Sequence, residues 1–127
     1  MSTHYGTLCK QILALDKTIR FAGVADRFGK IIAYQYREGL LPLLDTKDSE
    51  KSIKQSAIRM STRRTLEDKL GKTVYAFTMY EKVKRVTIPM PTKSHGEEIL
   101  MVSFDLESNH EQIILEKIIP LIRTQDP

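Results

Sequence analysis

Four oxygen-bearing side chains near the carboxyl end of the chain have a spacing that could bind calcium. They are Asp105, Glu107, Asn109 and Glu116, which match positions one, three, five and twelve of a calcium-binding loop. Position six of such a loop needs a glycine, but His110 occupies it, and residues 110–116 have a helical pattern that points the oxygens away from one centre. Ser108 and Glu111 instead fit a capping box, in which two side chains bind the free amides of a helix start. The sequence therefore predicts a helix start here and no metal site.

The other residues with reactive side chains are too scattered to indicate an active site. None of the histidines, His4, His95 and His110, has a second histidine or cysteine three or four residues away, the spacing of helical metal sites. No serine lies in a G-x-S-x-G turn. The only cysteine, Cys9, excludes an internal disulfide, and its apolar helical context predicts a small buried side chain rather than a nucleophile. We therefore expect no catalysis, no metal and no cofactor.

The stretch "VADRFGKIIAY", Val24 to Tyr34, raises the question of a phosphate-binding loop. Such a loop needs several glycines that lead from a strand into the amino end of a helix, whereas here the single Gly29 leads into a second apolar run. The stretch therefore predicts a hairpin turn, in which the Asp26 carboxylate caps the turn and Gly29 supplies a positive φ angle.

Basic side chains are concentrated in residues 47–72. This segment has eight basic and four acidic residues, a difference equal to the +4 net charge of the whole chain. Lys51, Arg59 and Arg63 share one helical face and could contact acidic side chains or phosphates. The nearby run "KVKR", residues 82–85, adds charge. A solvated face and a protein-docking face both explain this charge.

If the segment docks a protein, we expect the contact to involve a thin apolar stripe and its basic flanks. The candidate partner-binding residues are Lys51, Ile53, Ala57, Arg59, Met60, Arg63 and Arg64. Nucleic acid is disfavoured as the partner, because the net charge is small and no aromatic side chains are interleaved among the basic ones to stack on bases.

Length and composition predict one globular domain over residues 1–127. The chain is 41% hydrophobic and 28% charged, which is ordinary for a globular protein that needs no disulfide or metal for stability. Its apolar runs are far shorter than the ~20 residues of a membrane-spanning helix. The start "MSTHYGTLCK" lacks the pattern of a secretion signal, so a cytoplasmic location is expected.

Hydrophobic periodicity predicts three helices and five strands. An apolar stripe from Tyr5 to Ile19 indicates a first helix, and Ser49 and Gly71 suit the two ends of a second helix over about residues 50–70. A leucine-rich loop, residues 38–50, should cover an apolar surface. Pro120 should kink or end the last helix. The strands are expected at residues 20–26, 30–37, 72–80, 82–90 and 97–107, with the last of them central.

This order resembles that of the roadblock family, in the longin and profilin-like group. "FAGVADRFGKIIAY" is similar to the first hairpin of that family, and "SAIRMSTRRTLEDKLGKTVYAF" to its long second helix and third strand. The resemblance implies an α+β fold of order α-β-β-α-β-β-β-α, with a five-stranded antiparallel sheet and flanking helices. It also implies a non-catalytic regulatory module that forms a homodimer and docks a protein such as a small Ras-like GTPase.

Two other functions remain as alternatives. A sheet with flanking helices can open an apolar pocket for a small molecule, as PAS and GAF domains do. Its lining would be the strand aromatics Tyr34, Tyr36, Tyr75, Phe77 and Phe104, although such residues are more often plain core. The third possibility is weak nucleic-acid binding through the basic second helix.

Overall fold

The computed structural model describes residues 2–91 and 97–125, with Ser2 and Thr3 described by backbone alone. His95 lies outside the described residues. In chain order the elements are α1 (Ser2–Leu13), β1 (Ile19–Ala25), β2 (Ile31–Tyr36), α2 (Thr46–Arg64), α3 (Glu67–Leu70), β3 (Ala76–Met79), β4 (Lys84–Pro89), β5 (Ile99–Phe104), α4 (His110–Ile113), the π-helical turn η1 (Ile114–Ile118) and α5 (Ile119–Arg123).

The five strands form one antiparallel sheet in the order β2-β1-β5-β4-β3. The predicted α+β fold is therefore confirmed, including the central place of β5. β5 is buried on both faces, because Leu100, Val102 and Phe104 point to one layer of helices while Ile99 and Met101 point to the other. β3 and β2 are the two edges of the sheet.

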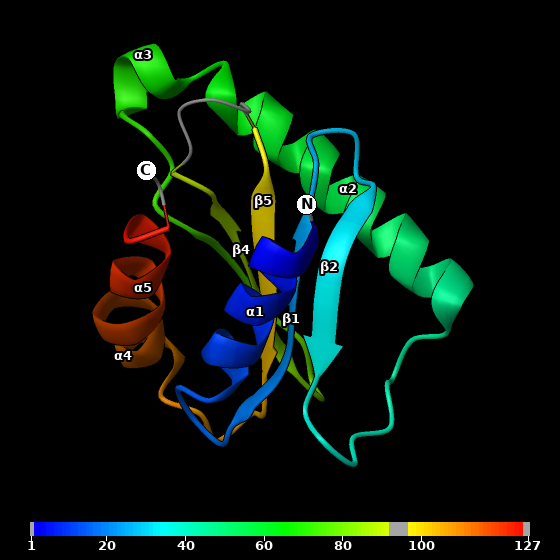
Figure 1. The fold of residues 1–127 in the computed structure, drawn as a ribbon. Coiled ribbons are helices and arrows are strands. Elements are labelled where there is room, and N and C mark those ends of the chain that lie inside the picture. The colour runs from blue at the N-terminus through cyan, green and yellow to red at the C-terminus, as the bar shows by residue number, and fades with distance from the viewer. Residues whose placement is uncertain (1, 92–96, 126–127) are drawn as a thin grey trace.

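Helices cover both faces of the sheet (Figure 1). α1 and the continuous last helix, α4-η1-α5, lie on one face and enclose the larger core, in which Leu8, Ile12 and Ile118 are fully buried. α2 crosses the other face over a smaller core centred on Ile53, Ala57 and Met60. Among the described residues, no helix has both the length and the apolar character needed to cross a membrane.

The first helix is shorter than predicted. α1 ends at Leu13, and the Asp16 carboxylate then accepts hydrogen bonds from the Thr18 amide and hydroxyl, which fixes a turn before β1. These bonds hold the pKa of Asp16 below its ordinary value. Leu15 and Ile19 keep the spacing of a helical apolar stripe although they lie outside α1. Leu15 packs into the larger core from the turn, and Ile19 packs into it from β1.

The second helix starts earlier than predicted and is divided in two. Asp45, not Ser49, is its N-cap, because the Asp45 carboxylate accepts the amide of Asp48 at 2.8 Å. The helix ends at Arg64, and the short α3 follows it. Gly71 then ends α3 with a positive φ of 87°, which favours glycine, but its ψ of 171° differs from the left-handed helical conformation that was predicted.

The last helix also differs from its prediction. Its N-cap is Asn109 and no side chain caps the amides there, so the predicted capping box does not form. Pro120 was predicted to kink the helix or to end it nearby, and the helix ends soon after it, at Arg123. The π-helical turn η1 precedes Pro120 and changes the hydrogen-bond register, and α5 continues to Arg123.

Candidate functional site

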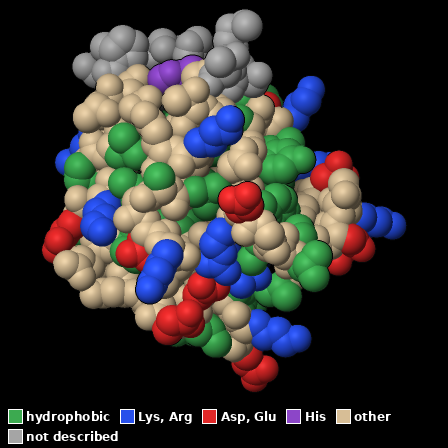
Figure 2. Space-filling view, turned by 60° about the horizontal axis from the view of Figure 1, so that its bottom comes forward, with side chains coloured by type: hydrophobic (Ala, Val, Ile, Leu, Met, Phe, Trp, Pro, Cys, Tyr) green, Lys and Arg blue, Asp and Glu red, His purple; other side chains and the backbone are tan. Residues whose placement is uncertain are grey.

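A broad groove of about 1210 Å³ opens between α2 and the sheet. Its floor is the α2-facing side of all five strands, its roof is α2, and its rims are the loop 37–45 and the β3–β4 turn. Figure 2 shows the molecule with the bottom of Figure 1 turned toward the viewer. On this face, hydrophobic side chains gather among Lys, Arg, Asp and Glu on the side of the loop 37–45. The groove is thus amphipathic rather than uniformly apolar.

The loop 37–45 does not cover an apolar surface as predicted. Leu41 is 86% exposed and Leu43 is 57% exposed. Leu40, Pro42, Leu43 and Leu44 line the groove from its rim instead. The chain therefore places apolar side chains beside an open surface.

One row of side chains crosses the floor of the groove from edge to edge. Cross-strand pairing joins Thr78 to Arg85, Arg85 to Ser103, Ser103 to Phe21, and Phe21 to Tyr36. Directly paired residues of antiparallel strands point to the same face, and all five line the groove. The three residues of the row on β3, β4 and β5 are therefore polar or basic, and the two on β1 and β2 are aromatic.

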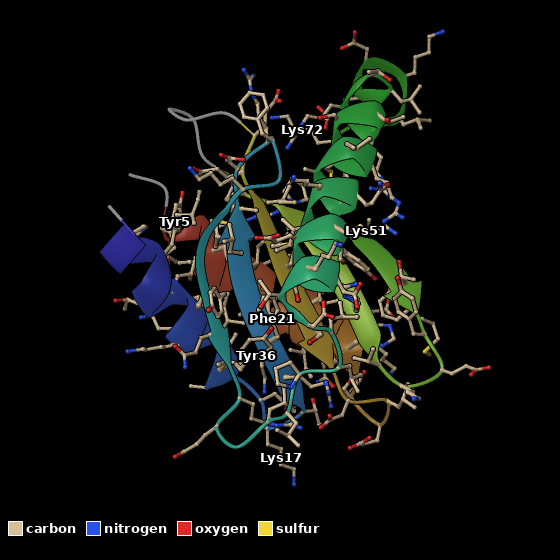
Figure 3. The ribbon with its side chains drawn as sticks, turned by 90° about the vertical axis from the view of Figure 1, so that its right-hand side faces the viewer. Tyr5, Lys17, Phe21, Tyr36, Lys51 and Lys72 are labelled. Carbon is tan, nitrogen blue, oxygen red and sulfur yellow. The ribbon has the colours of Figure 1, made fainter. Side chains whose placement is uncertain are left out.

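The aromatic half is a compact cluster of three rings. The ring centroids of Phe21 and Tyr36 are 5.0 Å apart, and Tyr34 lies edge-on to Tyr36 at 5.8 Å. The Phe21 ring lies over Gly23, where an added Cβ would come within 2.7 Å of it. Figure 3 shows Phe21 and Tyr36 on the sheet below the first turns of α2. Gly23 therefore allows the Phe21 ring to lie along the floor.

The roof of the groove is polar. Ser52, Gln55, Ser56, Arg59 and Arg63 recur at helical spacing and line the groove from α2. The apolar side of α2 points instead into the smaller core.

This orientation corrects part of the predicted partner-binding set. Ile53, Ala57 and Met60 are 9%, 2% and 0% exposed, because they pack against the sheet, and so they are not available to a partner. The apolar stripe in the sequence is thin because only one narrow side of α2 packs against the sheet.

The basic members of the predicted set have different environments. Within residues 2–91 and 97–125, no hydrogen bond or ion pair engages the side chains of Lys51, Arg59 or Arg63. Arg64 faces Glu97, with its Nη1 at 3.5 Å from Oε1. Lys51, Arg59 and Arg63 all line the groove, so the structure brings these three together.

Arg85 was not among the predicted site residues. It is half-buried on the floor, and no hydrogen bond or ion pair among the described residues engages its guanidinium group. In the sequence it was noted only as part of the basic run "KVKR". The alternation of that strand, in which Lys84 and Val86 point inward and Arg85 and Thr87 point to the groove, could have singled it out.

An ion-pair network fixes one end of the groove. The Arg37 guanidinium donates to the Asp105 carboxylate at 2.8 Å and to the carbonyl of Lys17 at 2.9 Å, and Arg20 donates to Asp105 at 3.2 Å. The Arg37 hydrogen bonds, followed by those of Arg20, hold the pKa of Asp105 below its ordinary value, although partial burial opposes the shift. Asp105 thus ties β1 and the end of β2 to β5.

The calcium-like spacing does not produce a metal site. Asp105 is engaged by the two arginines, and Asn109 binds Gln112 at 2.7 Å. In the described part of the chain, no group of three or more His, Cys, Asp or Glu side chains could hold a metal ion.

A second polar cluster lies on the other face of the sheet, below α4. The Lys84 ammonium, on a residue only 6% exposed, lies 2.8 Å from the carbonyl of Ser108 and 3.0 Å from His110 Nδ1. The Phe77 ring stacks on His110 with centroids 4.1 Å apart. Burial, and then the charge of Lys84, lower the pKa of His110. Among the described residues, Lys84, His110 and Phe77 are not part of the groove lining.

The aromatic lining predicted for a small-molecule pocket is divided between the two faces. Tyr34 and Tyr36 line the groove, whereas Phe104 is fully buried in the larger core and Tyr75 packs against that core. Phe77 stacks on His110. Cys9 is fully buried, and burial raises the pKa of its thiol to about 11, which agrees with the prediction that it is not a nucleophile.

Comparison with known proteins identifies the fold. No family model and no curated protein matches the sequence. Among solved structures, MglB of Myxococcus xanthus matches with a TM-score of 0.72 at 13% identity, covering 98% of this chain and 85% of that one. A Roadblock/LC7 domain from Streptomyces avermitilis matches with a TM-score of 0.70 at 11% identity, covering 94% and 92%. An MglB structure with a tetrameric arrangement matches with a TM-score of 0.65 at 14% identity, covering 94% and 88%. The chain therefore has the fold of Roadblock/LC7 domain structures.

Proposed function

We propose that residues 1–127 form a single non-catalytic interaction domain that self-associates and docks a protein partner. The roadblock fold supports this regulatory role, because the solved structures of this fold include assemblies such as the tetrameric arrangement of MglB. A small Ras-like GTPase is the partner that the resemblance of the hairpin and second helix implies. The free, buried Cys9 is in keeping with a cytoplasmic location, which is part of the same proposal.

The observation that carries the proposal is a set of unpaired basic side chains on one side of α2. Lys51, Arg59 and Arg63 have no acidic partner among the described residues, while Ile53, Ala57 and Met60 anchor the helix in the core beneath them. A helix held in this way presents fixed positive charge without using those side chains for folding. An acidic surface on a partner would complement it.

Self-association is proposed at the free edge of β3. Among the described residues, β4 is the only strand that pairs with β3, so the other side of β3 has backbone groups that a second copy can pair with. Met79 and Tyr80, at the end of that edge, are 59% and 47% exposed. Together they offer hydrogen bonds and apolar area for a sheet that continues across two copies.

Charge reversal tests the docking role. The double variant Arg59→Glu/Arg63→Glu should weaken capture of purified small Ras-like GTPases from the same organism, each loaded with GDP or with a GTP analogue. Its free energy of unfolding should stay within about 0.5 kcal/mol of the parent, as is usual for surface changes. The matched control is Lys10→Glu/Arg123→Glu, which makes the same change of charge on exposed residues of the opposite helices. Equal loss of capture in both variants, or unfolding of the first, would contradict a docking role for α2.

A further inference from the structure

We propose that the groove binds a small aromatic carboxylic acid, with the carboxylate on Arg85 and the ring against Phe21 and Tyr36. This site goes beyond the interaction domain proposed above, because its main residues lie on the strands of the groove floor, whereas the proposed docking residues lie on α2 beside the same groove. Three features of the described residues lead to it: an unpaired guanidinium, free hydroxyls beside it, and an open aromatic cluster at a matching distance.

The anionic end of the ligand is set by Arg85. This residue is half-buried between Thr78 and Ser103, its direct neighbours across β3 and β5. No carboxylate among the described residues pairs with it. A partly desolvated guanidinium without a counter-ion favours a carboxylate, which it can bind through two parallel hydrogen bonds. Arg59 and Arg63 on α2 line the same groove, together with the carboxylates of Asp45, Asp48 and Glu50 near the start of α2 and of Glu81 in the β3–β4 turn.

Hydroxyl groups complete the polar half of the site. Ser103, Thr78 and Thr87 line the floor, and Ser52 and Ser56 line the roof. None of these hydroxyls makes a side-chain hydrogen bond within the described residues. They can therefore donate to the oxygens of a bound acid or to a ring substituent.

The aromatic end is set by the cluster of Phe21, Tyr34 and Tyr36. Phe21 and Tyr36 are only half-buried, so parts of their rings face the groove. The two rings are tilted, with centroids 5.0 Å apart, and aromatic side chains in such clusters can contact a further ring by stacking or edge-on. Leu40, Pro42 and Leu43 line the rim of the groove with apolar side chains.

The separation of the two ends limits the length of the ligand. Phe21 and Arg85 are each adjacent to Ser103 in the same row, so they are two strand spacings apart, or about 10 Å between backbones. The Arg85 side chain extends over part of that distance. A single ring joined to a carboxylate by zero to two carbon atoms spans the rest, whereas a long acyl chain or a peptide is not required.

The test uses benzoate, phenylacetate and 3-phenylpropionate as probes of increasing length. Binding to the full chain is measured by calorimetry, and the site is located from amide chemical-shift changes in the unmodified protein. We expect at least one of the acids to bind and to perturb Ser103, Arg85 and Phe21. The neutral amide of that acid should bind with an affinity at least about tenfold lower, because it cannot form the charge-assisted pair. The cyclohexyl analogue of the same acid should also lose affinity.

The variants separate the site from unspecific attraction. Arg85→Gln should weaken the acid about tenfold and leave the amide unchanged, while Arg123→Gln, an exposed arginine on α5, should change neither. Absence of binding by all three acids, equal binding of acid and amide, or shift changes confined to other faces would overturn the proposal. Because the shift changes are measured on the unmodified protein, the proposal stays testable even if Arg85→Gln does not fold. The acid-binding measurements use the parent chain and the Arg85 and Arg123 variants. Their outcome therefore does not depend on whether Arg59→Glu/Arg63→Glu loses GTPase capture.

Discussion

At the scale of single residues, His110 links the pH of the solution to stability. Its Nδ1 faces the buried Lys84 ammonium at 3.0 Å. Burial, and then the charge of Lys84, lower its pKa from 6.5, while the charge of Glu111 opposes the shift. The unfolded chain therefore binds a proton below about pH 6.5 that the folded chain does not bind until a lower pH. Stability should be constant above that pH and decrease as the pH falls from it through the pKa of the folded state.

His110→Asn removes this titration and retains an oxygen that can accept from Lys84. Urea unfolding at pH 8, 6.5 and 5 should show a loss of stability between the last two values in the parent and a smaller loss in the variant. His4→Asn, at an exposed position of α1, is the control and should keep the behaviour of the parent. If the parent and His110→Asn lose the same amount, His110 is not the group responsible.

Asp105 contributes in the same direction as His110, but over a more acidic range of pH. Its pKa is lowered by the hydrogen bonds from Arg37 and then from Arg20, so the stabilisation is present at neutral pH and is lost as the pH falls through the lowered pKa of the folded state. Asp105→Asn should cost about 2 kcal/mol at pH 7, since it weakens charge-assisted bonds at a partly buried site. The difference between parent and variant, measured by chemical denaturation, should shrink as the pH is lowered toward 3. A constant difference would show that the effect is one of packing.

At the scale of elements, the β1–β2 turn is fixed against α2 through Gly29. The Asp26 carboxylate accepts from the amides of Phe28 and Lys30, and Gly29 has a φ of 83°, as the sequence predicted. The sequence did not predict that a Cβ at Gly29 would lie 2.6 Å from the Cα of Lys54. The turn and the middle of α2 therefore touch at their backbones.

Gly29→Ala should destabilise the chain by more than the cost of positive φ alone, which is about 1 kcal/mol. The matched control is Gly39→Ala, because Gly39 has a similar φ of 78° but no atom within 4 Å of an added Cβ. The difference in unfolding free energy between the two variants measures the contact with α2. Equal losses would show that the turn and the helix can separate at little cost.

Features that depend on neighbouring residues in the sequence were predicted more accurately than features that depend on packing between distant segments. The hairpin, the central strand and the turn at Glu81 and Lys82 follow from local periodicity and turn chemistry, and all are present. Helix boundaries were less accurate. Ile19 keeps the helical spacing although it packs into the core from β1, and Asp45 caps α2 with the same local N-cap chemistry that the sequence also offered at Ser49. The groove could not be predicted, since it depends on which side of the sheet α2 leaves uncovered.

At the scale of the whole molecule, the two faces of the sheet differ in how completely they are closed. One face is sealed by α1 and the last helix over a large core, while the other is crossed by α2 alone (Figures 1 and 3). The open face contains the groove, the unpaired basic side chains and the approach to the β3 edge. The proposed binding functions of this chain thus lie on the face of the sheet that the helices cover incompletely.

The oligomeric state is the first measurement to make on this arrangement. We expect light scattering on a size-exclusion column to give about twice the chain mass of 14.6 kDa at low salt and at high salt. A shared sheet edge depends on backbone hydrogen bonds and apolar area, which salt does not screen. The single variant Met79→Lys places a charge on the β3 edge and should shift the protein to monomer, whereas Arg27→Lys, on the exposed turn at the other edge of the sheet, should not. A monomer in the parent chain would contradict self-association, and a dimer that dissociates at high salt would move the interface from β3 to the charged side of α2.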